Sequence, residues 1–204
     1  MQKPKNTLVS SAVITLLISG AANAGGFSLY TEGSTIAIGN YAAGIAAEAA
    51  DASIGWYNPA GLVLIRDQQL VVSGAGVFPS TKVSGSTVFA SPGVPPYVQT
   101  FAVIQSSKSA FVPALHYAHP LGDKATFGLS ITSPFGLSSE YNDSSAVRYA
   151  ATFSELLTTN VSPEIGGRLS DNFAGGAGLD LQWAQVKFNR ITSLLVSNYL
   201  QSQF

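Results

Sequence analysis

Few side chains in this sequence are spaced for chemistry, and the two histidines are the first to consider. His116 and His119 lie three positions apart in a stretch whose pattern predicts a strand, and a strand sends such positions to opposite faces. No acidic cluster accompanies them and the chain has no Cys, so neither a metal site nor a triad of nucleophile, base and acid is predicted. We expect both histidines at the surface, near the end of a strand.

Glycine-rich stretches are the second feature that could carry chemistry, because such loops can cradle phosphate groups. Residues 74–76 and 175–178 lack both the strand-then-helix context and the Lys that a phosphate-binding loop needs. We interpret them as strand glycines, at places where backbones approach closely or a sheet bends. No cofactor, metal or enzyme activity is therefore predicted.

The composition indicates a surface that meets lipid. Of the 204 residues 46% are hydrophobic and only 10% are charged, and the formal net charge is -1. An ordinary soluble domain carries roughly 25% charged residues. Nucleic acid is excluded as a partner, because the chain has no basic stripe that could neutralise phosphates.

The first residues have the three parts of a secretory signal peptide. Lys3 and Lys5 precede an apolar run over residues 8–22, and the small residues Ala22 and Ala24 mark the exit. The run is shorter than the roughly 20 residues of a spanning helix, which disfavours a retained anchor helix. We therefore expect residues 1–24 to be removed after export.

The segment that follows predicts a compact plug over residues 25–66. Residues 36–52 are rich in Ala, which favours helix, while Gly39 and Gly44 weaken it, so we expect short packed helical pieces. No later segment reaches the length of a membrane-spanning helix. An exported, lipid-compatible chain of this kind can satisfy its backbone in a membrane as a closed β-barrel.

Alternating side chains over residues 67–190 predict the first strands and loops of such a barrel. Apolar residues alternate without exception with small or hydroxyl residues over residues 126–132, which places the two sets on opposite faces of a strand. Lipid would meet the first set and the lumen the second. The first set is Phe127, Leu129 and Ile131, and the second includes Thr126, Ser130 and Thr132. Five strands are predicted in all, over residues 68–78, 111–119, 126–132, 157–169 and 173–188.

The predicted connections alternate between short and long. Residues 120–124 and 170–172 are tight links, whereas residues 80–108 and 133–156 are long and rich in Ser, Gly, Pro and Tyr. Outer-membrane barrels alternate short periplasmic turns with longer extracellular loops in this way. A soluble all-β domain with irregular turns remains the alternative from the pattern alone.

One stretch resembles a known family. Residues 46–62 read AAEAADASIGWYNPAGL, and an acidic, Ala-rich helix followed by the turn Asn58, Pro59 and Ala60 resembles the N-terminal plug of the FadL/TodX (OMPP1) transporters. The similarity continues in order through residues 111–117, 121–137 and 160–163 to about residue 190. It implies an antiparallel all-β transmembrane barrel, here a fragment of about five strands, with a small N-terminal helical plug.

The resemblance implies passive uptake of long-chain fatty acids or other hydrophobic molecules across a Gram-negative outer membrane. In this family the plug closes the barrel, and ligand leaves sideways where the third strand kinks. The residues that match the kink are Ser133, Pro134, Phe135 and Gly136. Pro134 has no amide donor and Gly136 tolerates unusual dihedral angles, so strand pairing should fail there, although a simple strand end would show the same residues.

The resemblance also implies a cation for the carboxylate of the ligand. The position falls on Arg190, with Lys187 and Arg148 as further candidates, because guanidinium holds a carboxylate with two hydrogen bonds. An exposed rim arginine that faces lipopolysaccharide phosphates is the alternative for Arg190. Apolar residues on the long loops are candidates for an external capture groove. These are Phe101, Ile104, Leu137 and Tyr141.

The length departs from the family pattern. Family members build a longer closed wall, and about five strands cannot close alone, because an open edge in lipid leaves backbone groups unsatisfied. We expect residues 191–204 to be a divergent or truncated tail. The partners expected of such a protein are outer-membrane lipid, lipopolysaccharide and the barrel assembly machinery. A structural or adhesive surface barrel, or a non-functional truncated product, is the alternative to a transporter.

Overall fold

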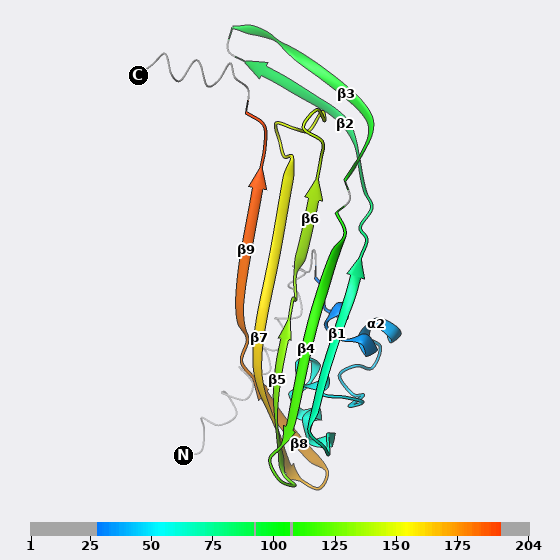
Figure 1. Cartoon of the computed structure of the whole chain (residues 1–204), viewed down its shortest axis with the longest axis vertical. Coiled ribbons are helices and arrows are strands. Elements are labelled where there is room, and N and C mark those ends of the chain that lie inside the picture. Colours follow the sequence, from blue (N-terminus) through cyan, green and yellow to red (C-terminus); the bar gives the residue numbers. More distant parts are fainter. Residues whose placement is uncertain (1–27, 92, 107, 193–204) are drawn as a thin grey trace, which may run out of the picture.

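The computed structural model describes residues 28–91, 93–106 and 108–192, in which short helices precede an elongated antiparallel sheet (Figure 1). The predicted signal peptide at residues 1–24 and nearly all of the predicted tail at 191–204 lie outside the described residues. Among the described residues, no helix combines the length and hydrophobicity needed to span a membrane.

The N-terminal region consists of short helical pieces, as the Ala and Gly pattern predicts. The Ser34 hydroxyl caps α2 by accepting hydrogen bonds from the amides of Ile36 and Ala37, and Tyr41 ends the helix in a left-handed conformation. The pieces are η2 (Thr31–Gly33), α2 (Thr35–Asn40), α3 (Ile54–Tyr57) and η3 (Pro59–Leu64).

The rest of the described chain forms strands, and every pair is antiparallel. The main sheet has the order β1, β4, β5, β7. β6 pairs with the first residues of β7, and β8 and β9 also pair with β7. The strands are β1 (Gln69–Val77), β2 (Thr81–Ser91), β3 (Val94–Ser106), β4 (Ala110–Pro120), β5 (Ala125–Thr132), β6 (Gly136–Glu140), β7 (Phe153–Ser170), β8 (Phe173–Gly178) and β9 (Leu181–Asn189).

The main sheet has seven strands among the described residues, whereas the alternating pattern predicts five. The predicted strand over residues 173–188 is divided into β8 and β9, and β6 lies in a predicted connection. β5 and β6 follow one another along β7, because Thr132 pairs with Asn160 and Gly136 with Leu157. β8 and β9 likewise continue one another along β7 in a single register. Among the described residues, the wall is therefore β1, β4, β5 with β6, β7, and β8 with β9.

The expectation that residues 80–108 form an open loop is wrong. β2 and β3 pair with each other in a separate two-stranded hairpin, whose turn includes Gly93 at a φ of 79°. Thr, Val, Phe and Tyr in this segment favour strands, and the hairpin satisfies its hydrogen bonds internally. Residues 133–156 also contain a strand, β6. The hairpin and the connection from β6 to β7 lie at one end of the sheet, and the two tight links lie at the other, as predicted (Figure 1).

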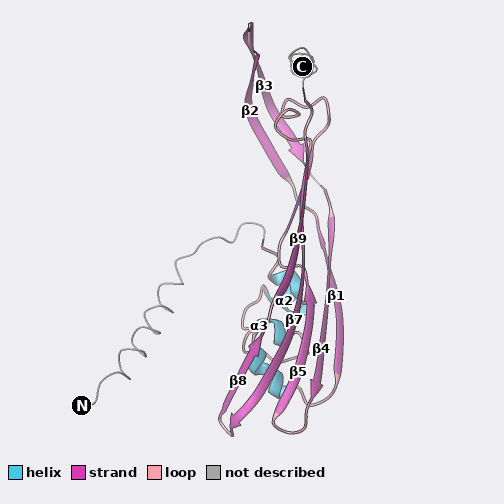
Figure 2. Ribbon diagram, turned by 90° about the vertical axis from the view of Figure 1, so that its left-hand side faces the viewer, coloured by secondary structure: helices cyan, strands magenta, loops and turns pink. Residues whose placement is uncertain are grey.

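The two faces of the wall differ as the sequence predicts. Thr126, Ser130 and Thr132 are buried on the face covered by the helices (Figure 2), whereas Ile131 points to the other face. Large apolar side chains remain exposed on that outer face, including Leu70, Val72 and Trp183. The apolar core lies between the helices and the wall. It consists of Ala52, Ile54, Leu62, Ile65 and Ala118.

The structure corrects the interpretation of His116. Its side chain is fully buried on the inner face, where Nε2 donates to the carbonyl oxygen of Gly33 at 2.6 Å and Nδ1 lies 2.9 Å from the Ser130 hydroxyl. Both ring nitrogens have partners, which removes most of the cost of burial. His119 lies exposed on the opposite face, as predicted.

Candidate functional site

The main sheet parts between β4 and β6. β4 pairs with β5 from Leu115 to Pro120, but its residues 110–114 pair with β1 alone. β6 pairs with β7, and no pairing joins it to β4 in the described part of the chain. Strand pairing with β7 is therefore interrupted at residues 133–135, as predicted at Pro134, and Phe135 pairs instead with Ser28 in an isolated bridge. The same prediction is wrong for Gly136, which pairs with Leu157 as the first residue of β6.

Other groups satisfy the backbone that this break exposes. The Thr158 hydroxyl accepts a hydrogen bond from the Phe135 amide at 2.9 Å and donates one to the Phe135 carbonyl at 2.6 Å. The carbonyl of Pro134 accepts a hydrogen bond from the Leu29 amide at 2.8 Å. The break is thus held by one side chain of the wall and by the N-terminal segment, so it is a built feature of the sheet.

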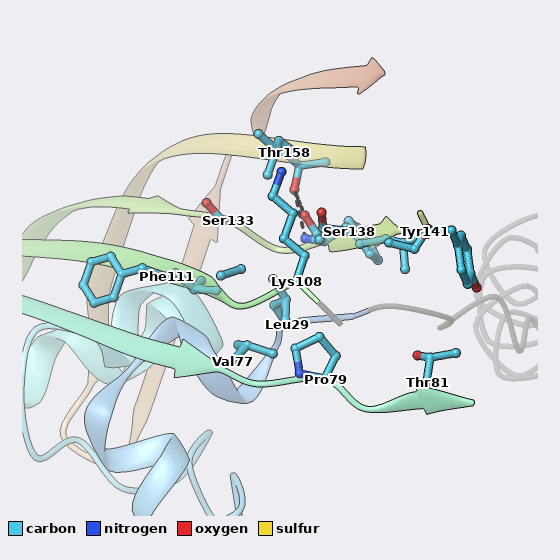
Figure 3. Close-up of a pocket in the computed structure, with 17 residues that line it drawn as sticks. Leu29, Val77, Pro79, Thr81, Lys108, Phe111, Ser133, Ser138, Tyr141 and Thr158 are labelled. Carbon is cyan, nitrogen blue, oxygen red and sulfur yellow. Dashed lines mark hydrogen bonds between the residues drawn. The ribbon is translucent and has the colours of Figure 1, made fainter. Parts of the chain in front are cut away.

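A cavity of about 470 Å³ lies at the break (Figure 3). Consecutive residues of a strand point to opposite faces of the sheet. The cavity is lined by two consecutive residues of β4, Phe111, which is 71% exposed, and Val112, which is 5% exposed. The same holds for Leu157 and Thr158, which are 46% and 5% exposed. The cavity therefore reaches both faces of the sheet. Leu29 from the N-terminal segment contributes to its lining.

The lining is apolar apart from hydroxyl groups and one amine. Lys108 is the only charged side chain among the described residues that line the cavity. Its Nζ lies 3.6 Å from Glu155 Oε2 and 4.4 Å from the centre of the Phe153 ring. Lys187 Nζ lies 3.0 Å from the other oxygen of the same carboxylate. Such a cavity can hold an apolar chain with one anionic group. The described residues contain no group of three or more His, Cys, Asp or Glu side chains placed to hold a metal ion.

The structure brings most residues of the predicted lateral opening to this cavity. Ser133, Phe135 and Gly136 line it, and Pro134 supplies the carbonyl that anchors the N-terminal segment. Of the predicted capture residues, Leu137 and Tyr141 line the same cavity. Phe101 and Ile104 instead lie half-buried on β3, in the separate hairpin.

The three predicted carboxylate partners do not line the cavity. Arg190 lies exposed just after β9, and it forms no ion pair with any described residue. Lys187 is paired with Glu155, and Arg148 donates to the Ser145 carbonyl at 2.9 Å and stacks on Tyr149.

Sequence reasoning missed three residues of the site. Lys108 carried a usable signal, because it is an isolated cation directly before an apolar strand in a chain poor in charge. Leu29 and Thr158 carried none, since an ordinary leucine and an inward-facing strand threonine have no special spacing. These two residues belong to the site because the fold brings Thr158 to the backbone of Phe135 and Leu29 to the carbonyl of Pro134.

The predicted plug turn holds the helical region against the wall. Asn58 accepts from the amide of Ala60 at 3.2 Å and donates to the carbonyl of Ala46 at 2.7 Å. Pro59 and Ala60 pack on bare backbone, because side chains at two wall glycines would overlap them. Those glycines are Gly166 and Gly176.

The first residues of the described chain are tied to the same region by a tyrosine pair. The Tyr57 hydroxyl donates to the Tyr30 carbonyl at 2.9 Å, and the two rings meet edge to face at 4.9 Å. Burial raises the pKa of the Tyr57 hydroxyl, because desolvation favours its neutral, donating form.

These features define a class of protein. An antiparallel wall with apolar residues outside and polar residues inside, and with short helices on its inner face, has the features of part of an outer-membrane barrel. The chain matches the family described as "Outer membrane protein transport protein (OMPP1/FadL/TodX)" over residues 15–203, and it belongs to that family.

Individual relatives agree with this assignment. The chain is 31% identical over 190 residues to a "Long-chain fatty acid transport protein" of Salmonella typhi, covering 93% of this chain and 41% of that protein. It is 28% identical to "Outer membrane protein P1" of Haemophilus influenzae, covering 100% and 45% of the two chains. The chain thus spans less than half the length of these relatives.

A solved structure supports the fold. The crystal structure of a Pseudomonas aeruginosa FadL homologue superposes with a TM-score of 0.52 at 23% sequence identity. The match covers 65% of this chain and 32% of the homologue. The described sheet and helices therefore have the fold of part of a FadL barrel.

Proposed function

We propose that this chain forms part of an outer-membrane transporter for the passive uptake of long-chain fatty acids or similar hydrophobic molecules. Family membership and the names of the relatives support transport across the outer membrane. The observation that carries the proposal is the cavity at residues 133–135, which is lined by residues of both faces of the sheet. An apolar ligand could leave the lumen there without crossing polar loops.

The plug controls this path in our proposal. Residues 25–66 would fill the lumen, and Leu29 lies in the cavity while its amide holds the Pro134 carbonyl. A shift of the N-terminal segment would break that hydrogen bond and at the same time withdraw the Leu29 side chain from the cavity. The path would then open sideways, through the wall, rather than along the barrel axis.

The predicted partners follow from this location. Residues 1–24 would direct export, the barrel assembly machinery would insert the wall, and lipopolysaccharide would surround its outer face. Arg190, Lys187 and Arg148 remain predicted carboxylate contacts, and each would meet the ligand outside the described cavity.

Blocking the cavity tests the proposal. The Cβ of a residue at position 136 would lie 2.8 Å from Leu29 Cδ1, so Gly136→Phe places a ring in the path. The control is Gly167→Phe, where the nearest atom to the Cβ is 4.0 Å away. Oleate uptake is measured in a strain without its own transporter that carries the native gene of this protein. Uptake should be lost with Gly136→Phe and kept with Gly167→Phe at equal amounts in the outer membrane.

The same experiment addresses a structural or adhesive barrel. Such a protein would give no oleate uptake in the unmodified form, and that result would reject transport. Equal uptake by both phenylalanine variants would reject the lateral path but leave transport in place.

A further inference from the structure

We propose that Lys108 anchors the anionic head of a ligand in the cavity, and that Glu155 is the internal carboxylate that the ligand displaces. This inference rests on the proposed function and adds to it the residue that selects acids over neutral apolar molecules. The argument concerns three side chains: Lys108, Glu155 and Lys187.

Lys108 is placed for this role by the chain and by the cavity. It lies two residues before β4, on the side of the break opposite β6 and β7. Its side chain extends across the cavity towards Thr158 (Figure 3), and its amine reaches Glu155 and Phe153 at the start of β7. The stem of Lys108 thus lines the cavity while its charge lies at the far side.

The contact between Lys108 and Glu155 is easily exchanged. The two charged atoms are 3.6 Å apart, and the Lys108 side chain is 38% exposed, so solvent weakens their attraction. Lys187 holds the other oxygen of Glu155 at 3.0 Å. Because Lys187 stays in place, Glu155 keeps a partner when Lys108 turns to another anion. The exchange therefore leaves no carboxylate unpaired.

A fatty acid supplies the anion that fits. Its alkyl chain would lie against Leu29, Phe111, Phe135 and Leu137, and its carboxylate would take the place of Glu155 Oε2 at the Lys108 amine. A fatty alcohol of the same length would fill the apolar part equally but gain no ionic contact. Charge at Lys108 should therefore affect acids alone.

Opposite effects of two substitutions distinguish anchoring from a structural ion pair. Both Lys108→Gln and Glu155→Gln break the contact between these two residues, and Glu155→Gln also breaks the contact with Lys187. A purely structural cluster therefore predicts a loss from Glu155→Gln at least as large as that from Lys108→Gln. Anchoring predicts about tenfold weaker oleate binding for Lys108→Gln, the size expected for one charged hydrogen bond. Glu155→Gln removes the competitor, so its oleate binding should be unchanged or tighter.

The binding assay uses the protein expressed from its native gene and purified in detergent, with oleate and oleyl alcohol as probes. Oleyl alcohol should bind equally well to the unmodified protein and to Lys108→Gln, which also shows that the variant is folded. Lys82→Gln is the matched control, because Lys82 is an exposed lysine of the separate hairpin. It should bind both probes as the unmodified protein does.

Two results would overturn the inference in different ways. Equal oleate binding by Lys108→Gln and the unmodified protein, or parallel losses in Lys108→Gln and Glu155→Gln, would reject the anchor and leave the transporter intact. No binding of either probe by the unmodified protein would reject the proposed function itself, and the anchor with it.

Discussion

Gly166 of β7 and Gly176 of β8 are partners in register, and the turn at Pro59 rests on both of them. A Cβ at Gly166 would overlap the Pro59 carbonyl, and one at Gly176 would overlap the backbone of Ala60. The wall thus has a gap in its side chains where the plug turn touches it. Glycine is required there by close approach and not by an unusual dihedral angle, since neither residue has a positive φ.

Adding one methyl group at this contact should loosen the plug. Gly176→Ala forces Pro59 and Ala60 away from the wall, and overpacking of this kind costs about 1–3 kcal/mol. The measurement is urea unfolding in detergent, followed by tryptophan fluorescence, to which Trp56 in α3 and Trp183 in β9 both contribute. The control is Gly39→Ala in α2, where a Cβ has nothing within 4 Å, and its free energy of unfolding should not fall. Equal stability of the two variants would show that the close contact carries no energy.

His116 is a second point where plug and wall depend on each other. Removing the imidazole with His116→Ala leaves the Gly33 carbonyl and the Ser130 hydroxyl without their partner and creates a cavity under η2. We expect a loss of about 2–4 kcal/mol in the free energy of unfolding. His119→Ala, on the exposed face of the same strand, should change it by less than about 0.5 kcal/mol. Similar losses in both variants would contradict the network.

The alternating pattern predicts β4, β5 and β7 well, because one face of each of these strands meets the helical region and the other does not. Residues 126–132 show this most clearly, and their faces are as expected. The pattern fails for residues 80–108, because a hairpin with no buried face has no alternation to read. The prediction that His116 lies at the surface is wrong for a related reason. Its burial depends on Gly33, which lies 83 positions earlier in the chain. Local spacing contains no information about such a partner.

The candidate site shows the same division between local and distant information. Pro134 predicts a failure of pairing from its own backbone chemistry, and pairing with β7 is interrupted there, although Gly136 is already paired again. The cavity is not predictable in this way, since Leu29, Lys108 and Thr158 come from three separate segments. The predicted basic residues, Arg148, Lys187 and Arg190, all follow β6, whereas the cation in the cavity precedes β4.

Thr158 provides the sharpest test of whether the break in the wall is maintained by specific contacts. Thr158→Val keeps the shape of the side chain and removes the hydroxyl that serves both the amide and the carbonyl of Phe135. Two backbone groups then lose their partner, at a cost of about 1–3 kcal/mol. Thr159→Val is the matched control, because the next residue of β7 is exposed and points to the other face. Urea unfolding should show the loss only for Thr158→Val, and oleate binding should weaken with it because Phe135 lines the cavity. If Thr158→Val is as stable as Thr159→Val and binds oleate normally, the Phe135 backbone does not need this hydroxyl, and the break owes its shape to Pro134 and the N-terminal segment alone.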